Sequence, residues 1–100
     1  MSITIKKESY EEVFYTHQFR RSDGKGWLGS SETLTDPAVA VLNSAGEEQE
    51  EMVGYVSVVE ETKVRYQLKG GDAGKSYTIR IRTETSDGNK FEDNVTLSVL

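Results

Sequence analysis

Apolar and polar residues alternate strictly in three segments of the last third of the chain. The apolar positions are Val64, Tyr66 and Leu68 in the first segment, Tyr77, Ile79 and Ile81 in the second, and Val95, Leu97 and Val99 in the third. Successive side chains of a β-strand point to opposite faces, so a period of two gathers the apolar groups of a segment on one side, which a helical period would not do. The pattern therefore predicts three β-strands, each with one buried and one exposed face.

The connection between the last two strands must contain an odd number of residues. Their apolar positions are all odd-numbered, and residues paired across an antiparallel hairpin share a face. A three-residue loop, Ser86-Asp87-Gly88, meets this condition with Gly88 in the left-handed conformation. The resulting register turns Asp93 inward, so we expect a bulge near Glu92–Asp93 or a frayed strand end. The same register pairs Ile79 with Val95 and Tyr77 with Leu97.

A glycine-rich corner precedes the second of these strands. Gly70, Gly71 and Gly74 form a turn, and Tyr77 opens the strand that follows. A tyrosine in this position, with its hydroxyl bonded back to upstream backbone, is the tyrosine corner of immunoglobulin-like sandwiches. The alternative interpretation is that Tyr77 is simply an aromatic residue of the core.

Shorter strands are predicted upstream. Residues 13–19 alternate with aromatic and β-branched side chains, which suit a half-buried pleated surface, and a shorter alternating piece surrounds Ile3 and Ile5. Residues 31–42 hold two apolar pieces that Asp36–Pro37 interrupts, since proline belongs at a turn, at a strand's first residue or at an edge. Residues 52–59 resume strand character. With about seven strands and no long helical pattern, the chain is predicted to be all-β, a single domain of residues 1–100 folded as an immunoglobulin-like antiparallel β-sandwich.

Composition excludes several classes of protein. The 100 residues contain no cysteine, so the stability of the fold must come from packing rather than from disulfides. The net charge of −5 argues against nucleic-acid binding, which rewards clustered lysine and arginine. Neither a signal peptide nor an apolar run long enough to span a membrane is found in the sequence, so we expect a soluble protein made in the cytoplasm.

The sequence contains few residues that could form a catalytic or metal site. Its one histidine, His17, lies among aromatic residues within a predicted strand, where a partly buried structural role is expected. The acidic segment 47–51 lacks the ligand spacing of a calcium loop, so an extended, solvated loop is expected there. We therefore predict no catalytic residue, no metal and no cofactor.

Two groups of residues are candidates for partner binding. Trp27, in a glycine-flanked loop with Leu28, is either a plug over one end of the sandwich, which we favour, or an exposed anchor for a partner. Arg65, Arg80 and Arg82 lie on the polar sides of their strands and would form a basic patch if those strands were neighbours. We favour the alternative, in which these arginines pair across strands with Glu84 or Glu92.

The sequence resembles a family of small tailed-bacteriophage proteins described as fiber-tail adaptors. The resemblance rests on the Gly-Gly-x-x-Gly-x-x-Tyr turn of Gly70, Gly71, Gly74 and Tyr77, on the Thr-x-Thr-Ser-x-Gly hairpin ending at Gly88, and on the alternating strand at 95–99. Trp27-Leu28 and Glu32-Thr33-Leu34 are similar to the family's upstream segments. The acidic 44–51 segment and Phe91-Glu92-Asp93 depart from the family pattern and bear on the partner surface more than on the fold.

The resemblance implies a virion or prophage component, assembled in the bacterial cytoplasm, that bridges tail and fiber or neighbouring virion proteins. Such an assembly module would use exposed edge strands or end loops to join copies of itself or other tail proteins. The alternative is a ligand-binding or adhesion sandwich, for instance for carbohydrate, which a solvent-facing strip of Trp27, Tyr15 or Tyr55 would favour. An enzyme is a more distant alternative, which a deep pocket holding His17 beside carboxylates would favour.

Overall fold

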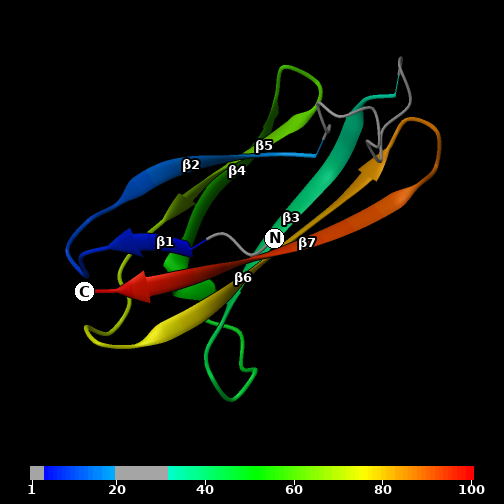
Figure 1. The fold of residues 1–100 in the computed structure, drawn as a ribbon. Helices are drawn as coiled ribbons and strands as arrows, with labels where there is room; N and C mark the ends of the chain where they lie inside the picture. The colour runs from blue at the N-terminus through cyan, green and yellow to red at the C-terminus, as the bar shows by residue number, and fades with distance from the viewer. Residues whose placement is uncertain (1–3, 20–31) are drawn as a thin grey trace.

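The computed structural model describes residues 4–19 and 32–100, which form two β-sheets facing each other (Figure 1). The four-stranded sheet has the order β1-β7-β6-β3, and the three-stranded sheet the order β2-β5-β4. A short 3-10 turn, Glu50–Met52, precedes β4. The prediction of an all-β sandwich of about seven strands is confirmed. The strands are β1 (Thr4–Lys7), β2 (Val13–Gln18), β3 (Leu34–Leu42), β4 (Val53–Val59), β5 (Lys63–Leu68), β6 (Ser76–Thr85) and β7 (Lys90–Val99).

One strand pair departs from the expected antiparallel arrangement. Strand β1 runs parallel to β7, with Thr4 opposite Thr96 and Lys7 opposite Val99. Parallel neighbours cannot be joined by a hairpin, and here the whole intervening chain separates the two strands. The orders β2-β5-β4 and β3-β6-β7 correspond to strands B-E-D and C-F-G of immunoglobulin domains. The immunoglobulin-like topology stays a prediction, which this order supports.

The core is built from the alternating positions that the sequence indicated. Ile79 and Ile81 of β6 are fully buried, and so is Leu97 of β7. The facing sheet contributes Val64, Tyr66 and Leu68 of β5, none of them more than 1% exposed. Apolar surface removed from water contributes roughly 25 cal/mol per Å², so this shared interior is the main source of stability in a chain without disulfides. The buried apolar residues are Phe19, Leu34, Val41, Met52, Val64, Tyr66, Leu68, Tyr77, Ile79, Ile81, Val95, Leu97 and Val99.

The β6–β7 hairpin has the predicted register. Ile79 lies opposite Val95 and Tyr77 opposite Leu97, and Gly88 closes the three-residue loop at φ +84°. The prediction of a bulge near Glu92–Asp93 is wrong, because pairing is continuous from Ser76–Ser98 to Glu84–Lys90. Asp93 does turn inward, opposite Ile81, where its carboxylate reaches the imidazole of His17 on the facing sheet. The inward carboxylate thus meets a polar partner, His17, across the sandwich, and the strand keeps its regular pairing without the expected bulge.

Strand β3 is continuous where two separate apolar pieces were expected. Its pairing with β6 shifts between Thr35 and Ala38, and Asp36 takes φ +45° at the shift. Pro37 therefore sits in a bulge of an edge strand, where its missing N–H costs no ladder bond. The chain accommodates the proline without ending the strand.

The corner before β6 has the geometry expected of a tyrosine corner. Gly70, Gly71 and Gly74 all have positive φ, at +63°, +94° and +83°. The backbone N–H of Asp72 donates to the hydroxyl oxygen of Tyr77 at 3.0 Å, and the ring of Tyr77 is buried. That this bond stabilises the fold stays a prediction, which removal of the hydroxyl tests.

We expect Tyr77→Phe to lower the free energy of unfolding by about 1 kcal/mol, the usual net contribution of one hydrogen bond. The ring and its packing are retained, so the loss isolates the bond to Asp72. Urea unfolding of the variant measures it, with Tyr10→Phe as the control because the Tyr10 side chain is 95% exposed. Equal stability of Tyr77→Phe and the unaltered chain would leave Tyr77 as an ordinary core aromatic.

Candidate partner-binding site

The three arginines considered as a basic patch do not lie on one surface. Arg80 and Arg82 project from β6 in the four-stranded sheet, whereas Arg65 belongs to β5 in the other sheet. Arg82 donates from Nε to Oε1 of Glu92 on β7 at 2.5 Å, the cross-strand pairing that we favoured. The hydrogen bond from Arg82 lowers the pKa of the Glu92 carboxyl below its usual value. The idea of a patch that includes Arg65 is therefore wrong.

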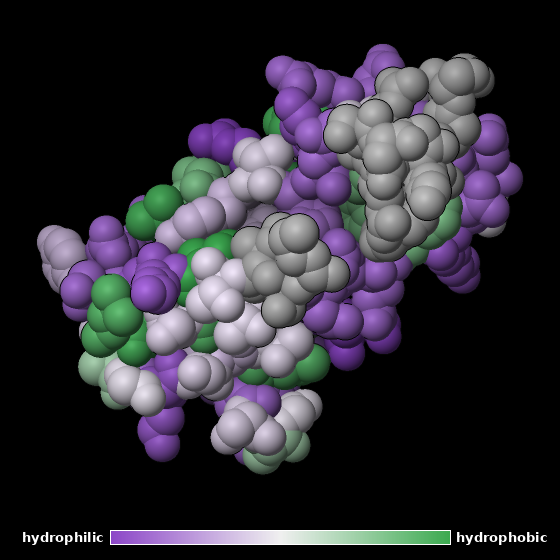
Figure 2. Space-filling model, viewed as in Figure 1, coloured by the Kyte–Doolittle hydropathy of each residue, from purple (hydrophilic) through white to green (hydrophobic). Residues whose placement is uncertain are grey.

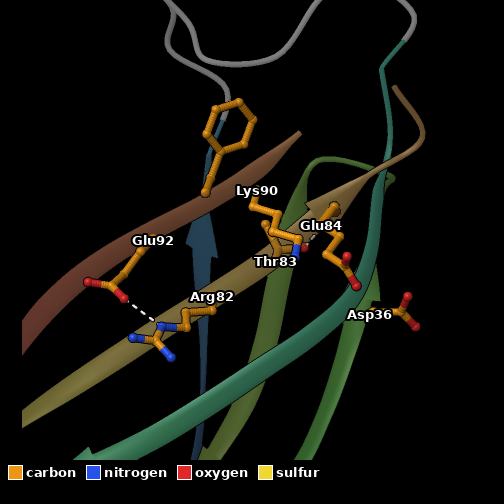
Figure 3. A pocket seen from close by; sticks show the side chains of 7 residues that line it. Asp36, Arg82, Thr83, Glu84, Lys90 and Glu92 are labelled. Atoms are coloured by element: carbon orange, nitrogen blue, oxygen red, sulfur yellow. Dashed lines mark hydrogen bonds and ion pairs between the residues drawn. The ribbon is translucent and has the colours of Figure 1, made fainter. Parts of the chain in front are cut away.

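A shallow groove of about 450 Å³ runs beside this ion pair (Figure 3). Its charged side chains are of mixed sign, and the hydroxyl of the buried Thr83 is turned to the backbone oxygens of Thr35 and Glu84, each at 3.0 Å. Figure 2 shows hydrophilic residues gathered around the turn of the β6–β7 hairpin, the end of the sandwich where this groove lies. The groove thus presents surface charges of both signs, two of them paired, rather than a reactive group. Its lining residues are Asp36, Arg82, Thr83, Glu84, Lys90, Phe91 and Glu92.

The outer face of the three-stranded sheet carries a different cluster, formed by Phe14, Tyr55 and Arg65. The rings of Phe14 and Tyr55 are stacked with centroids 6.5 Å apart, and the Arg65 guanidinium lies 4.0 Å from the centroid of the Phe14 ring. Tyr55 is 76% exposed and Phe14 38% exposed. We call these three residues the aromatic–arginine cluster. A cation over an aromatic face is attractive by about 0.5–1 kcal/mol at exposed sites.

A bulge in β4 gives Tyr55 its outward position. Val53 pairs with Leu68 and Val56 with Tyr66, so Gly54 and Tyr55 together oppose Gln67. The glycine leaves room for the Gln67 side chain, since a Cβ at position 54 would lie only 3.1 Å from Gln67 Cβ. Bulges commonly re-aim a side chain at a functional surface. The exposed Phe14 between polar neighbours on the wet face of its strand was a signal that the sequence interpretation passed over.

The tyrosines named for the adhesion alternative do not share a surface. Tyr15 turns inward against Tyr66, with centroids 6.2 Å apart, whereas Tyr55 faces solvent on the other side of the sheet. Burial and the nearby Glu11 raise the pKa of the Tyr15 hydroxyl. Trp27 lies outside the described residues. The strip of Tyr15 with Tyr55 that would have favoured adhesion is therefore not formed.

His17 occupies the structural position that its surroundings predicted. Its side chain is 9% exposed, and its ring packs edge-on against Phe19 with centroids 5.0 Å apart. Nε2 lies 2.9 Å from Oδ2 of Asp93, within ion-pair distance, but forms no hydrogen bond with the described residues. The contact joins β2 of one sheet to β7 of the other, a bridging role within the sandwich.

The four glutamates of the acidic segment 47–51 are exposed to solvent, as expected, but the segment is not a plain extended loop. Glu48 forms a β-bridge with Leu42, and Glu50–Met52 is the 3-10 turn. Upstream, Asn43 Oδ1 accepts hydrogen bonds from the backbone N–H groups of Ala45, at 3.0 Å, and Glu47, at 2.9 Å. Backbone bonding thus holds the segment in spite of its repelling charges. Within residues 4–19 and 32–100, no group of three acidic or histidine side chains could hold a metal ion.

These features define a class of protein. The described part of the chain is a β-sandwich that offers a solvent-facing aromatic–arginine cluster and strand edges, which are elements of protein–protein contact. The described part of the chain contains no helix long and apolar enough to cross a membrane.

Comparison with known proteins identifies the family. The model of the family described as podophage GP4 fiber-tail adaptor protein gp77 matches residues 7–98, so the chain belongs to this family and is a phage structural protein. The search of curated proteins found no match. Among solved structures, CopC from Methylosinus trichosporium OB3b is similar in fold, with a TM-score of 0.62 and 16% identity over 98% of this chain and 82% of that protein. Identity this low speaks for the fold alone.

Proposed function

We propose that the protein is a non-enzymatic assembly module of a phage particle that links tail and fiber or neighbouring virion proteins. It acts as a single domain and joins the virion in the bacterial cytoplasm. Family membership supports the bridging role, and an adaptor needs surfaces that other proteins can bind. The observation that carries the proposal is the aromatic–arginine cluster on the outer face of the three-stranded sheet.

The chemistry of this cluster suits a contact between proteins. Tyrosine and arginine are enriched among the residues that dominate binding energies, and a few such residues supply most of the affinity. The stacking of Phe14 on Tyr55 and the position of Arg65 over Phe14 restrain the three side chains before binding. Restrained groups lose less conformational entropy when a partner covers them. The cluster therefore offers a partly pre-organised contact surface.

Removal of the cluster tests the proposal. We expect Tyr55→Ala combined with Arg65→Ala to weaken binding to tail particles that lack this protein by about tenfold or more, since hot-spot truncations cost about 2 kcal/mol or more. Co-sedimentation of the purified variants with such particles measures the loss. Tyr10→Ala is the matched control, because it removes a tyrosine that is 95% exposed and is not part of the cluster.

A second double variant separates the two outer faces of the sandwich. Arg80→Ala combined with Arg82→Ala removes the basic side chains of the four-stranded sheet that the sequence marked as candidates for a partner. We expect this variant to bind tail particles nearly as well as the unaltered chain, because Arg82 is already paired with Glu92. Loss of binding in this variant, with retention in the Tyr55/Arg65 variant, would move the partner surface to the other face.

A further inference from the structure

The strands of the three-stranded sheet turn positive charge, and no negative charge, to its outer face. The cations are Lys63 and Arg65 of β5, and none of the three strands contains an aspartate or glutamate. The chain as a whole has 17 acidic and 12 basic residues and a net charge of −5, so the strands of this face have the opposite sign to the molecule. The side chains turned outward are Phe14, Thr16, Gln18, Lys63, Arg65, Gln67, Tyr55, Ser57 and Val59.

The outer face of the four-stranded sheet has no such bias. Strand β6 places Arg80, Arg82 and Glu84 on it, and β7 places Lys90 and Glu92. The guanidinium of Arg82 is paired with the carboxylate of Glu92. Interspersed charges of both signs are the ordinary condition of a protein surface. The outer face of the three-stranded sheet is therefore the unusual one.

Arg65 is the unpaired cation of this face. Nζ of Lys63 lies 2.5 Å from Oε2 of Glu60, at the turn between β4 and β5, so this lysine already has a counter-charge. Arg65, in contrast, forms no ion pair with any described residue. Its cross-strand neighbours, Thr16 on β2 and Ser57 on β4, carry no charge. The Arg65 charge is thus left without a carboxylate in the described part of the chain.

The guanidinium of Arg65 is restrained, yet its hydrogen-bonding groups are not used. Its central carbon lies 4.0 Å from the centroid of the Phe14 ring, and the side chain donates no hydrogen bond to a described residue. A guanidinium presents its N–H donors as a rigid fork that matches the two oxygens of a carboxylate. The contact with Phe14 therefore limits the movement of a group that is suited to bind a carboxylate.

The exposed rings beside Arg65 define the second requirement for a ligand. Phe14 and Tyr55 are 38% and 76% exposed, and an apolar side chain that covered them would remove both from water. An exposed ion pair alone contributes little, about 0–1 kcal/mol. A ligand that matches the whole cluster therefore combines a carboxylate with an apolar or aromatic group.

We propose that the aromatic–arginine cluster binds a segment of a partner virion protein in which an aspartate or glutamate stands beside an aromatic or apolar side chain. The carboxylate accepts hydrogen bonds from Arg65, and its neighbour packs on Phe14 and Tyr55. The assignment rests on the proposed linking function and adds the chemistry of the partner. Charge complementarity selects an acidic segment, because a basic one would be repelled. A nucleic acid would need clustered cations, which this face lacks.

Two substitutions that differ in charge but hardly in shape test the proposal. Arg65→Gln and Arg65→Glu both remove the guanidinium from Phe14. We expect the dissociation constant for tail particles that lack this protein to rise about fivefold in Arg65→Gln and about fiftyfold in Arg65→Glu, because the glutamate opposes the partner's carboxylate. Titration by co-sedimentation measures both values, and circular dichroism checks that each variant is folded.

Arg80→Gln and Arg80→Glu are the matched controls. Arg80 belongs to β6, on the outer face of the other sheet, so we expect these two variants to bind tail particles alike. Salt gives an independent measurement. Raising the NaCl concentration from about 0.05 M to about 0.5 M should weaken binding of the unaltered chain more than binding of Arg65→Gln, since salt screens the attraction between opposite charges. Equal salt dependence of the two would contradict the proposal.

The outcomes separate the chemistry of the partner from the linking function itself. Equal binding of Arg65→Gln and Arg65→Glu, with binding still weakened by Tyr55→Ala combined with Arg65→Ala, would overturn the acidic segment and leave the linking function standing. Tighter binding of Arg65→Glu than of Arg65→Gln would assign a basic partner instead. If no variant of the cluster weakens binding, the proposed contact surface fails and the acidic segment with it.

A second copy of the chain also offers carboxylates, in its exposed acidic segment 47–51. Sedimentation equilibrium of the unaltered chain and of Arg65→Glu distinguishes this occupant from a partner protein. Self-association that Arg65→Glu abolishes would assign the cluster to the second copy and overturn the proposal. Binding to tail particles by a chain that stays monomeric supports the partner protein.

Discussion

Gly71→Ala is expected to lower the free energy of unfolding by about 2–5 kcal/mol, the largest effect of any conservative change in the corner before β6. Position 71 has φ +94°, where an L-residue with a Cβ is strained by roughly 1–2 kcal/mol. An added Cβ would also lie 2.8 Å from Val99 Cγ2 and 2.9 Å from Met52 Cε. Overpacking of this kind costs typically about 1–3 kcal/mol more. Met52 can swing its terminal methyl aside, but β-branched Val99 has little freedom to do so.

Gly70→Ala is the matched control for that change. Its φ is also positive, at +63°, but an added Cβ would have no atom within 4 Å. We therefore expect a loss of only about 1–2 kcal/mol, the backbone strain alone. Chemical denaturation of both variants measures the difference between them. Equal losses would mean that packing against Met52 and Val99 contributes nothing and that the corner tolerates a side chain in either place.

The second large effect is a loss of stability in alkaline solution that depends on Tyr66. This side chain is 1% exposed, and its burial raises the pKa of the hydroxyl to about 12, from an ordinary value of 10.0. Between pH 10 and 12 the unfolded chain releases the proton while the folded chain retains it, so stability falls as the pH rises. One pKa unit corresponds to about 1.4 kcal/mol, and the loss across this window is thus about 3 kcal/mol.

Tyr66→Phe should remove most of this alkaline slope. Unfolding free energies measured in urea from about pH 9 to about pH 12 compare the variant with Tyr10→Phe, whose side chain is 95% exposed. Lys7 acts with the opposite sign, because its burial lowers its pKa and stability then rises with pH until the unfolded lysine has also lost its proton. A slope that persists in Tyr66→Phe would assign the alkaline loss to another group.

The fold was predictable wherever a period of two extended over several residues. The parity of Ile79, Ile81 and Val95 was enough to fix the β6–β7 register and the length of its loop, because a slip by one residue would expose the core face. Position 7 is odd-numbered, like Ile5, so the two side chains share a face of their strand, yet a buried lysine was not expected there. Lys7 is 1% exposed, and its Nζ donates to the backbone oxygens of Glu8 and Gly70, both at 2.6 Å. Its partners come from chain segments that local pattern cannot bring together.

The candidate site was less accessible to sequence reasoning for a related reason. A strand's wet face is marked only by polar residues, and pattern alone does not say which strands are neighbours. Arg65 was grouped with Arg80 and Arg82, although its neighbour in space is Phe14 of β2. Tyr55 depended on a bulge for which Gly54 was the single local signal. The parallel β1–β7 pair was equally hidden, because the two strands stand at opposite ends of the chain.

That parallel pair determines how the molecule carries a mechanical load. Thr4–Lys7 and Thr96–Val99 run side by side in the same direction, and the ladder extends to Leu100, whose N–H donates to Lys7 C=O at 2.8 Å. A pull in opposite directions on Thr4 and on Leu100 draws the two strands past each other along their length. The backbone bonds between them are then loaded in shear and share the force, whereas an antiparallel pair pulled from one end would unzip bond by bond.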